Sequence, residues 1–448
     1  MKRLFGTDGI RAVAGEPPLD AAGARRFGAA LAEVLEADYG RPCRVVIGRD
    51  TRESGPWLRD EVVAGLAARG MRVVDAGVIT TPGLAFVLRD GGFDSGVMIS
   101  ASHNPYQDNG LKAFARGGQK LSDEAEIRLE ERMLAAARPV PGAAAPSPED
   151  GHGLRARYVA FLERLVPATD RLRGLRLALD CANGAAYEIA PRVFRHYGAE
   201  PICVGVDPDG RNINHECGSL HVEALARSVV AAGCDVGLAF DGDADRVLAV
   251  DRRGRVVDGD AILCLAALRL QRDGKLRGSA IVATIMSNLW LETRLAASGI
   301  ELRRAAVGDK YVLERMVADD LALGGEQSGH VIFRDLATTG DGILTGLMLL
   351  DSLADGGTTL EEFLDGVEPV PQLQQSVRVS AKPDLRSHPS IGPAVRDVER
   401  ELGSHGRVVL RYSGTEPVAR VMVEGPDAAA VRGHVERLVG LIERELGA

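Results

Sequence analysis

Aromatic side chains are scarce in this sequence and make up only 4% of its 448 residues. Proteins that bind single-stranded nucleic acid stack the bases on aromatic rings, and proteins that bind a phosphate backbone carry an excess of basic residues. The formal net charge of this chain is instead −9. We therefore expect no nucleic-acid partner.

The sequence also lacks long hydrophobic runs and paired cysteines. Its longest apolar runs, such as AILCLAAL at 261–268, are shorter than the roughly 20 residues that span a bilayer. No apolar stretch follows the basic start MKRLFGTDG, as it would in a secretory signal. The six cysteines form no CxxC pair and show no zinc-ligand spacing. These features predict a cytoplasmic protein with reduced thiols and no membrane partner.

Two common nucleotide-binding motifs are missing as well. Neither GxxxxGK[ST] nor GxGxxG occurs, which disfavours the P-loop and dinucleotide-binding folds. What is present is the composition of an ordinary globular protein, 45% hydrophobic and 26% charged. Because a chain of 448 residues exceeds what one hydrophobic core normally serves, we expect two to four domains.

Short β-branched runs alternate with helical stretches rich in Ala, Leu and Arg, a pattern typical of α/β domains. An apolar strand followed by a polar, Gly-containing loop recurs along the chain, which predicts three similar α/β domains with mixed sheets. Pro-rich breaks mark possible boundaries, and two strands and a helix after the last break predict a smaller C-terminal α+β domain. The breaks lie at 137–151 and 366–375, and the expected domains cover 1–155, 156–255, 256–368 and 369–448.

The stretch DGDADR follows the apolar strand VGLAF and is the strongest local signal. In extended backbone, carboxylates two residues apart point to one side, so Asp241, Asp243 and Asp245 can converge on one hard cation. An EF-hand is the obvious competitor, but its sixth and twelfth positions should be Gly and Glu, whereas Arg246 and Arg252 stand there. The pattern favours Mg²⁺ over a solvated acidic turn.

Two further loops suit a sugar phosphate. RYSGTEPVAR at 411–420 combines small residues, which let backbone amides approach an anion, with arginines that donate to it in pairs. In GGEQSGH at 324–330, the alternating Glu326, Ser328 and His330 face the same way if the loop is extended, and could bind neighbouring sugar hydroxyls. The phosphate-binding candidates are Arg411, Ser413, Gly414, Thr415 and Arg420.

Together these stretches resemble the α-D-phosphohexomutase superfamily. FGTDGIR at 5–11, ISASHNP at 99–105 with DNGLK at 108–112, and then DGDADR, GGEQSGH and SGTEP stand in the family's order over nearly the whole chain. The resemblance implies three α/β domains and a smaller fourth around a central cleft, each contributing one loop. It also implies an isomerase that moves a phosphoryl group between positions 6 and 1 of a hexose.

The resemblance assigns the remaining roles. Ser102 carries the phosphoryl group and, with the three aspartates, binds one Mg²⁺ per active site. Lys112 and His330 are candidate acid/base groups. Because three aspartates and a serine phosphate carry about −5 and one Mg²⁺ returns about +2, nearby cations must supply the rest, and Arg246, Arg11 and Lys112 are the candidates. A hexosamine 1,6-bisphosphate is then the intermediate and activator, the partner is a small sugar phosphate, and the protein is a monomer or homodimer.

The sugar is less firmly indicated than the reaction. Gln327 and FGTDGIR favour the glucosamine branch of the family, which would supply amino-sugar nucleotide and cell-wall precursors, over the mannose and glucose branches. A metal-dependent sugar phosphatase remains an alternative, although a hydrolase needs no second phosphate site. A non-catalytic sugar-phosphate sensor is a third. A Ser-His hydrolase is disfavoured because adjacent residues do not easily reach the nucleophile–base geometry, and no GxSxG surrounds Ser102.

Overall fold

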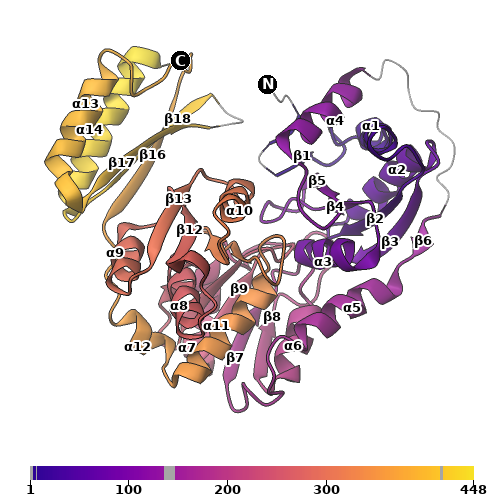
Figure 1. Cartoon of the computed structure of the whole chain (residues 1–448), viewed down its shortest axis with the longest axis horizontal. Helices are drawn as coiled ribbons and strands as arrows, with labels where there is room; N and C mark the ends of the chain where they lie inside the picture. The colour runs from indigo at the N-terminus through magenta and orange to yellow at the C-terminus, as the bar shows by residue number, and fades with distance from the viewer. Residues whose placement is uncertain (1–3, 7, 136–146, 414–416, 448) are drawn as a thin grey trace.

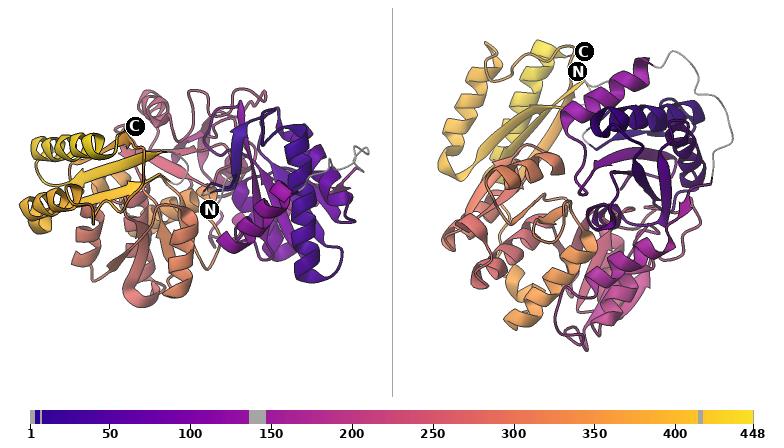
Figure 2. Two further views of the ribbon diagram at one scale, coloured as in Figure 1. Left: turned by 90° about the horizontal axis from the view of Figure 1, so that it is seen from above. Right: turned by 45° about the vertical axis from the view of Figure 1, so that its right-hand side comes forward.

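Four β-sheets, each with its own helices, follow one another along the part of the chain that the structure describes. The structure, a computed structural model, describes residues 4–6, 8–135, 147–413 and 417–447. In Figure 1 the four units form an arc, with the first sheet at one end and the C-terminal unit at the other. The turned views in Figure 2 show the C-terminal unit as a separate lobe. The predicted fold class, three α/β units and a smaller α+β unit, is confirmed. The predicted domain limits stay predictions.

The first sheet is mixed and has the strand order β1-β5-β4-β2-β3-β6. β5 runs antiparallel to both of its neighbours, and the other pairs from β4 to β6 are parallel. One apolar cluster packs on each face of this sheet. The elements are β1 (Ile10–Val13), α1 (Ala21–Tyr39), β2 (Arg44–Arg49), α2 (Gly55–Ala67), β3 (Arg72–Val78), α3 (Thr81–Gly91), β4 (Ser95–Ile99), β5 (Asp108–Ala115), α4 (Asp123–Ala135), β6 (Glu149–Asp150) and α5 (His152–Leu162).

The second and third sheets share one continuous apolar core, which includes Leu177 and Leu238 of the second sheet and Ile281 and Leu323 of the third. The two units are therefore expected to move together. The strand orders are β11-β10-β9-β7-β8 and β13-β12-β14-β15. The elements of the second are β7 (Arg176–Asp180), α6 (Ile189–His196), β8 (Glu200–Val204), α7 (Val222–Ala232), β9 (Val236–Phe240), β10 (Val247–Asp251) and β11 (Val256–Val257); those of the third are α8 (Gly259–Arg272), β12 (Ala280–Thr284), α9 (Leu289–Ala297), β13 (Glu301–Ala305), α10 (Asp309–Ala318), β14 (Leu323–Gly325), β15 (Val331–Phe333), α11 (Gly342–Gly356) and α12 (Leu360–Leu364).

The C-terminal unit has its own core between a three-stranded antiparallel sheet, ordered β16-β18-β17, and two helices. The predicted last helix is present, and the Asp427 side chain caps it by accepting from the amides of Ala429 and Ala430. A separate core and a short connection suit a unit that moves relative to the others. The elements are β16 (Gln372–Arg378), α13 (Ile391–Leu402), β17 (Arg407–Tyr412), β18 (Val418–Glu424) and α14 (Ala428–Leu446).

One buried ion pair anchors this unit to the third sheet. Arg407 Nε lies 2.7 Å from Glu424 Oε2, and Glu424 Oε1 accepts from the amide of Leu289 at 2.6 Å. The Arg407 guanidinium also donates to the carbonyls of Ile285 and Ser287. The loop after β12 is therefore the contact about which the C-terminal unit can turn.

Candidate active site

A cavity of about 490 Å³ lies where the four units meet. The walls carry polar and charged side chains from loops at the ends of strands, as is usual for ligand sites in α/β folds. Each of the four units contributes to the lining, with residues such as Arg11 and His103 from the first, Asp245 and Arg246 from the second, Asp309, Glu326 and His330 from the third, and Arg411, Ser413 and Arg420 from the fourth.

Ser102 lies in the turn after β4 and is buried. Its backbone is left-handed, with φ at 54°, a conformation that is uncommon for serine. The hydroxyl donates to Asp241 Oδ2 at 2.5 Å, so the first and second units meet at this atom. A strained residue held in contact with a buried carboxylate is typical of a functional site.

Two residues that the sequence analysis did not single out hold this turn. The buried guanidinium of Arg52 donates to the carbonyls of Ser102 at 3.0 Å and Asn104 at 2.8 Å, and Asp50 pairs with its Nε. Asn214, from the second unit, donates to the same two carbonyls at 2.9 and 3.0 Å. No sequence motif sets Arg52 apart from the other basic residues, because its partners come from a distant loop.

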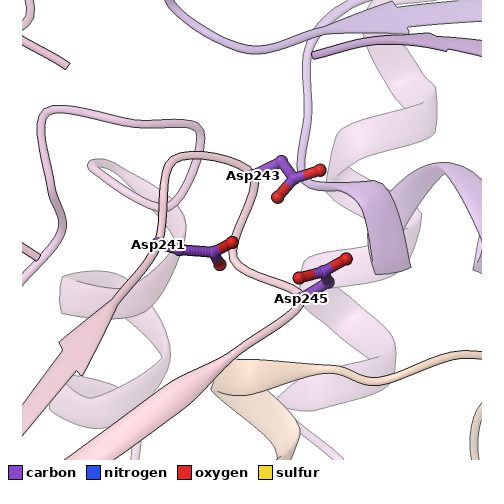
Figure 3. A group of neighbouring side chains, drawn as sticks. All are labelled: Asp241, Asp243 and Asp245. Carbon is purple, nitrogen blue, oxygen red and sulfur yellow. The ribbon is translucent and has the colours of Figure 1, made fainter. Parts of the chain in front are cut away.

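The three predicted metal ligands do converge (Figure 3). One carboxylate oxygen from each of Asp241, Asp243 and Asp245 lies within 4.8 Å of the others, and all three residues are buried. The reason expected from sequence, alternation in extended backbone, is wrong. The loop is a turn in which the amide of Ala244 donates to the carbonyl of Asp241 and Ala244 has a φ of 54°. The turn brings the carboxylates together.

The cluster suits a hard divalent cation. Burial, together with the carboxylates of Asp245 and Asp243, raises the pKa of Asp241 well above its usual range. Asp243 Oδ1 and Asp245 Oδ1 are buried and accept no hydrogen bond. A bound cation would satisfy both oxygens and relieve the repulsion between the carboxylates. The Ser102 hydroxyl, beside Asp241, could complete the ligand set.

The predicted cations surround this cluster. Lys112 Nζ lies 2.8 Å from Asp243 Oδ2 and 2.9 Å from Asp8 Oδ2. Burial disfavours a charged lysine, but the carboxylates of Asp243 and Asp8 outweigh it and raise the pKa of Lys112 above its usual value. Arg11 also pairs with Asp8, at 2.5 Å. The Arg246 amide donates to Asp241 Oδ1 at 3.2 Å.

His103 lies beside Ser102 and was not predicted to belong to the site. Burial, with help from the charges of Arg246 and Arg11, lowers the pKa of His103 to about 4, so the ring is neutral at pH 7. Its Nδ1 lies 3.3 Å from the Ser102 hydroxyl, but that hydroxyl donates to Asp241 Oδ2, so the two adjacent side chains meet without the nucleophile–base hydrogen bond of a hydrolase. Arg246 donates to that nitrogen at 3.2 Å and thereby occupies its lone pair. His103 therefore does not act as the base of a Ser-His hydrolase.

The predicted sugar loop is a tight turn between β14 and β15 rather than an extended segment. Glu326 donates its amide to the carbonyl of His330, and the amide of Gly329 donates to the carbonyl of Glu326. Glu326 and His330 consequently line the cavity, whereas Ser328 lies exposed at the tip, 3.5 Å from Glu326 Oε2. The amide of Gly308 donates to Glu326 Oε1 and fixes its orientation.

His330 lies deep in the cavity wall between two carboxylates. Its Nδ1 is 3.7 Å from Asp245 Oδ1, and its Nε2 is 3.4 Å from Asp309 Oδ2. Burial disfavours the charged ring, but Asp309 and Asp245 outweigh it and raise the pKa of His330 above its usual value. The amide of Gly340 donates to Nε2, which places the ring proton of the neutral form on Nδ1.

Two arginines form the phosphate-binding candidate on the C-terminal unit's side of the cavity. Arg411 and Arg420 stand opposite each other on β17 and β18, and both line the cavity with Ser413. Burial, together with the neighbouring Arg420, lowers the pKa of Arg411. Adjacent guanidinium groups at one cavity wall are suited to hold an anion. The predicted Gly414 and Thr415 lie outside the described residues.

Three charged residues of the site were missed by the sequence analysis. Lys120 Nζ lies 2.5 Å from Asp8 Oδ1 and 2.6 Å from Asp309 Oδ2, and all three residues line the cavity. Burial disfavours the charged lysine, but Asp309 and Asp8 raise the pKa of Lys120 above its usual value. FGTDGIR contains Asp8, but the sequence gives no signal for Lys120 or Asp309, which are 189 residues apart.

The fold and the site define a protein with the architecture of a phosphohexomutase. Family models described as phosphoglucomutase/phosphomannomutase match the chain domain by domain. The alpha/beta/alpha domains I, II and III match residues 2–139, 156–254 and 258–370, and the C-terminal domain matches 376–441. The chain belongs to the phosphoglucomutase/phosphomannomutase family, which confirms the resemblance drawn from its motifs.

Three curated relatives are similar to this chain over nearly its whole length. Phosphoglucosamine mutases of Solibacter usitatus, Cereibacter sphaeroides and Deinococcus radiodurans are 48%, 47% and 47% identical to the chain. The matches cover 100%, 99% and 99% of this chain and 99%, 99% and 98% of those proteins. The similarity therefore extends over all four domains.

Solved structures agree on the fold. A phosphoglucomutase/phosphomannomutase family protein from Burkholderia thailandensis has a TM-score of 0.81 and 27% identity, with 99% of each chain covered. An N-acetylphosphoglucosamine mutase from Aspergillus fumigatus, solved in complex with GlcNAc-6P and magnesium, has a TM-score of 0.69 and 20% identity, with 99% and 96% covered. Among the described residues, no helix combines the length and apolar character needed to cross a membrane.

Proposed function

We propose that the chain interconverts glucosamine 6-phosphate and glucosamine 1-phosphate, the reaction that the name of its curated relatives indicates. The observation that carries this proposal is the contact between the buried Ser102 hydroxyl and the aspartate cluster, whose Asp245 lines the same cavity as the two arginines of the C-terminal unit. A nucleophile at one end and an anion site at the other suit a substrate with two phosphate positions.

The reaction we propose begins with Ser102 phosphorylated. The phosphoryl group passes from Ser102 to the 1-hydroxyl of glucosamine 6-phosphate, and the serine oxygen regains a proton. The resulting hexosamine 1,6-bisphosphate turns over in the cavity and returns its 6-phosphoryl group to Ser102, which releases glucosamine 1-phosphate. Arg411, Ser413, Gly414, Thr415 and Arg420 hold whichever phosphate is not being transferred.

Charge balance supports the assignment of Mg²⁺ and of the surrounding cations. Three aspartates and a serine phosphate carry about −5, and one Mg²⁺ returns about +2. Bound at Asp241, Asp243, Asp245 and Ser102, the ion would screen the transferred phosphoryl group. Lys112, Arg246 and Arg11 supply the remaining positive charge, so the loaded site is close to neutral.

We assign the proton transfers to Lys112 and His330. Lys112 is held in its charged form by Asp243 and Asp8, which suits a general acid that returns the proton to Ser102. His330 is the last residue of the sugar loop, where the attacking hydroxyl must lose its proton, and its Nε2 can accept that proton only when the hydrogen bond from the Gly340 amide opens. We further propose a monomeric or homodimeric cytoplasmic enzyme, in keeping with six cysteines that form no disulfide.

A coupled assay on glucosamine, glucose and mannose 6-phosphates tests the proposal. We expect the highest kcat/KM with glucosamine 6-phosphate and the 1-phosphate isomer as the product. Mannose or glucose phosphate as the best substrate would place the chain in another branch of the family. Release of inorganic phosphate as the main product would instead indicate the phosphatase that the sequence left open.

Glu326 and Arg420 should separate sugar binding from phosphate binding. Loss of a hydrogen bond to the charged Glu326 should remove roughly 1.5 to 3 kcal/mol of binding, or about one to two decades in kcat/KM. Glu326→Ala should weaken the three sugars unequally, because they differ at position 2, where Glu326 would meet an amino group in glucosamine and a hydroxyl in glucose and mannose. Arg420→Ala should weaken them equally, because the phosphate is common to all.

Matched variants sharpen this comparison. Glu326→Gln keeps an acceptor for the Gly308 amide, so a loss in that variant reports on the sugar contact rather than on the loop. Arg420→Lys keeps the charge without the paired donors. An equal loss for all three sugars in Glu326→Gln would contradict the assignment of Glu326 to the sugar.

A further inference from the structure

Asp8, Lys120 and Asp309 line the cavity, yet the proposed reaction gives them no role. Asp8 precedes β1, Lys120 follows β5, and Asp309 is the first residue of α10. The side chain of Lys120 is only 11% exposed and lies between the two carboxylates, at 2.5 and 2.6 Å. It therefore links the first unit to the third.

These contacts continue into a closed ring in which three carboxylates alternate with Lys120, His330 and Lys112. Asp8 lies 2.9 Å from Lys112, which lies 4.0 Å from Asp245. On the other side, Asp309 lies 3.4 Å from His330, which lies 3.7 Å from Asp245. Three units contribute to this ring, whose members in order are Asp8, Lys120, Asp309, His330, Asp245 and Lys112.

A buried ring of this kind resists distortion. Each charged member has partners on two sides, and removing one member leaves its partners buried without full compensation. The Lys120–Asp309 contact is where the first unit meets the third, and Asp309 in turn contacts His330. The position of the serine loop relative to the sugar loop thus depends on this contact. The metal loop is joined to the sugar loop separately, by the shared core and by the Val247 amide, which donates to the Gly329 carbonyl at 3.1 Å.

We propose that Lys120 and Asp309 are a positioning pair that holds the sugar loop, residues 326–330, against the serine loop of the first unit. The inference rests on the proposed function for its kinetic consequence, but its structural consequence stands without it. Neither residue needs to touch the reacting atoms. The pair acts by fixing where His330 and Glu326 lie when the phosphoryl group is transferred.

The next residue of α10 supplies a matched control. Lys310 Nζ lies 2.6 Å from Asp123 Oδ1, so this pair also joins α10 to the first unit. It does not line the central cavity and takes no part in the ring. Asp123 is also far more exposed, at 44% of its side chain, than either carboxylate of the ring that Lys120 contacts. Breaking the Lys310–Asp123 pair tests whether the loss of any ion pair between the first and third units has the same effect.

The kinetic test compares Lys120→Met, Lys120→Arg and Lys310→Met in the full-length protein with glucosamine 6-phosphate. We expect Lys120→Met to lower kcat/KM by at least about 100-fold, mostly through kcat, because the sugar loop is misplaced in the transition state. Lys120→Arg, which keeps the charge, should stay within about 10-fold of the wild type, and Lys310→Met within about 3-fold. Equal losses in Lys120→Met and Lys310→Met, or none in Lys120→Met, would overturn the proposal.

Hydrogen exchange tests the same proposal without any substrate. The amides of residues 326–330 should exchange at least about 10-fold faster in Lys120→Met than in the wild type. Their exchange rate in Lys310→Met should equal that of the wild type. If Lys120→Met does not fold, Asp309→Asn, which keeps the side-chain size, should give the same local acceleration. Unchanged exchange in the variant that folds would refute the positioning role. A wild type that fails to isomerise glucosamine 6-phosphate would refute only the proposed function.

Discussion

Ser102→Ala should lower isomerase activity by on the order of 10⁴-fold or more, because it removes the only atom that we assign to carry the phosphoryl group. The fold should persist. The substitution removes one hydrogen bond, to Asp241, which corresponds to about 1 to 3 kcal/mol of stability. Alanine also adopts a left-handed φ about as readily as serine does. Steady-state kinetics and a thermal melt measure the two effects separately.

Ser95→Ala is the control for this variant. Ser95 is also buried, lies on β4 in the same unit, and donates one hydrogen bond to the carbonyl of Phe114 at 2.8 Å. Its loss should lower stability by a similar amount and leave turnover nearly unchanged. Turnover in Ser102→Ala close to that of Ser95→Ala would contradict a phosphoserine mechanism.

Removal of the metal site should cause the second-largest loss of isomerase activity. Asp243→Asn should reduce activity by on the order of 10³-fold, since a bound cation contributes several kcal/mol to the stabilisation of charge in a transition state. Stability should change little. The asparagine oxygen can still accept from Lys112 and Thr81, and the repulsion among three buried carboxylates falls.

Chelation and thermal melts check this prediction without relying on the variant alone. A strong chelator should abolish activity, and added Mg²⁺ should restore it. Mg²⁺ should raise the melting temperature of the wild type, because it binds the folded state only, and leave that of Asp243→Asn unchanged. Full activity in the chelator would contradict the metal assignment.

Local sequence patterns predicted the parts of the site that lie within one loop. Ser102 in ISASHNP and the three aspartates of DGDADR lie in the turns that directly follow β4 and β9. A strand that is buried throughout, such as VGLAF, is recognisable from its apolar run, and the polar loop after it must lie at the sheet's edge. The family and the fold class followed from the order of such motifs.

The backbone geometry within the loops was harder to predict from the sequence. The aspartates converge through a turn with Ala244 at a positive φ, whereas alternation in an extended chain was expected. The same assumption gave the sugar loop an extended backbone, but it is a turn between β14 and β15 with Ser328 exposed at the tip, and the contact of Ser328 with the sugar stays a prediction. Positive φ values at alanine or serine carry no sequence signature, since these residues are common everywhere.

Contacts between units could not be predicted from the residues of one segment, and the meeting of Ser102 with the aspartates was implied only by the family resemblance. Asn214 reaches the Ser102 carbonyl from the second unit, and Lys120 reaches Asp309 across 189 residues. Such pairs depend on how the separate cores are docked, and composition or periodicity within one segment contains no record of that arrangement. The charged ring around the cavity is therefore a property of the assembled fold.

Transfer of label from Ser102 to the sugar tests the central claim most directly. Protein phosphorylated at Ser102 with ³²P, prepared from labelled glucosamine 1,6-bisphosphate, would be mixed with unlabelled glucosamine 6-phosphate and sampled within one turnover. We predict that the label leaves Ser102 and appears in hexosamine bisphosphate and then in glucosamine phosphates. Label that stays on the protein while glucosamine 1-phosphate accumulates, or that appears as inorganic phosphate, would contradict the account.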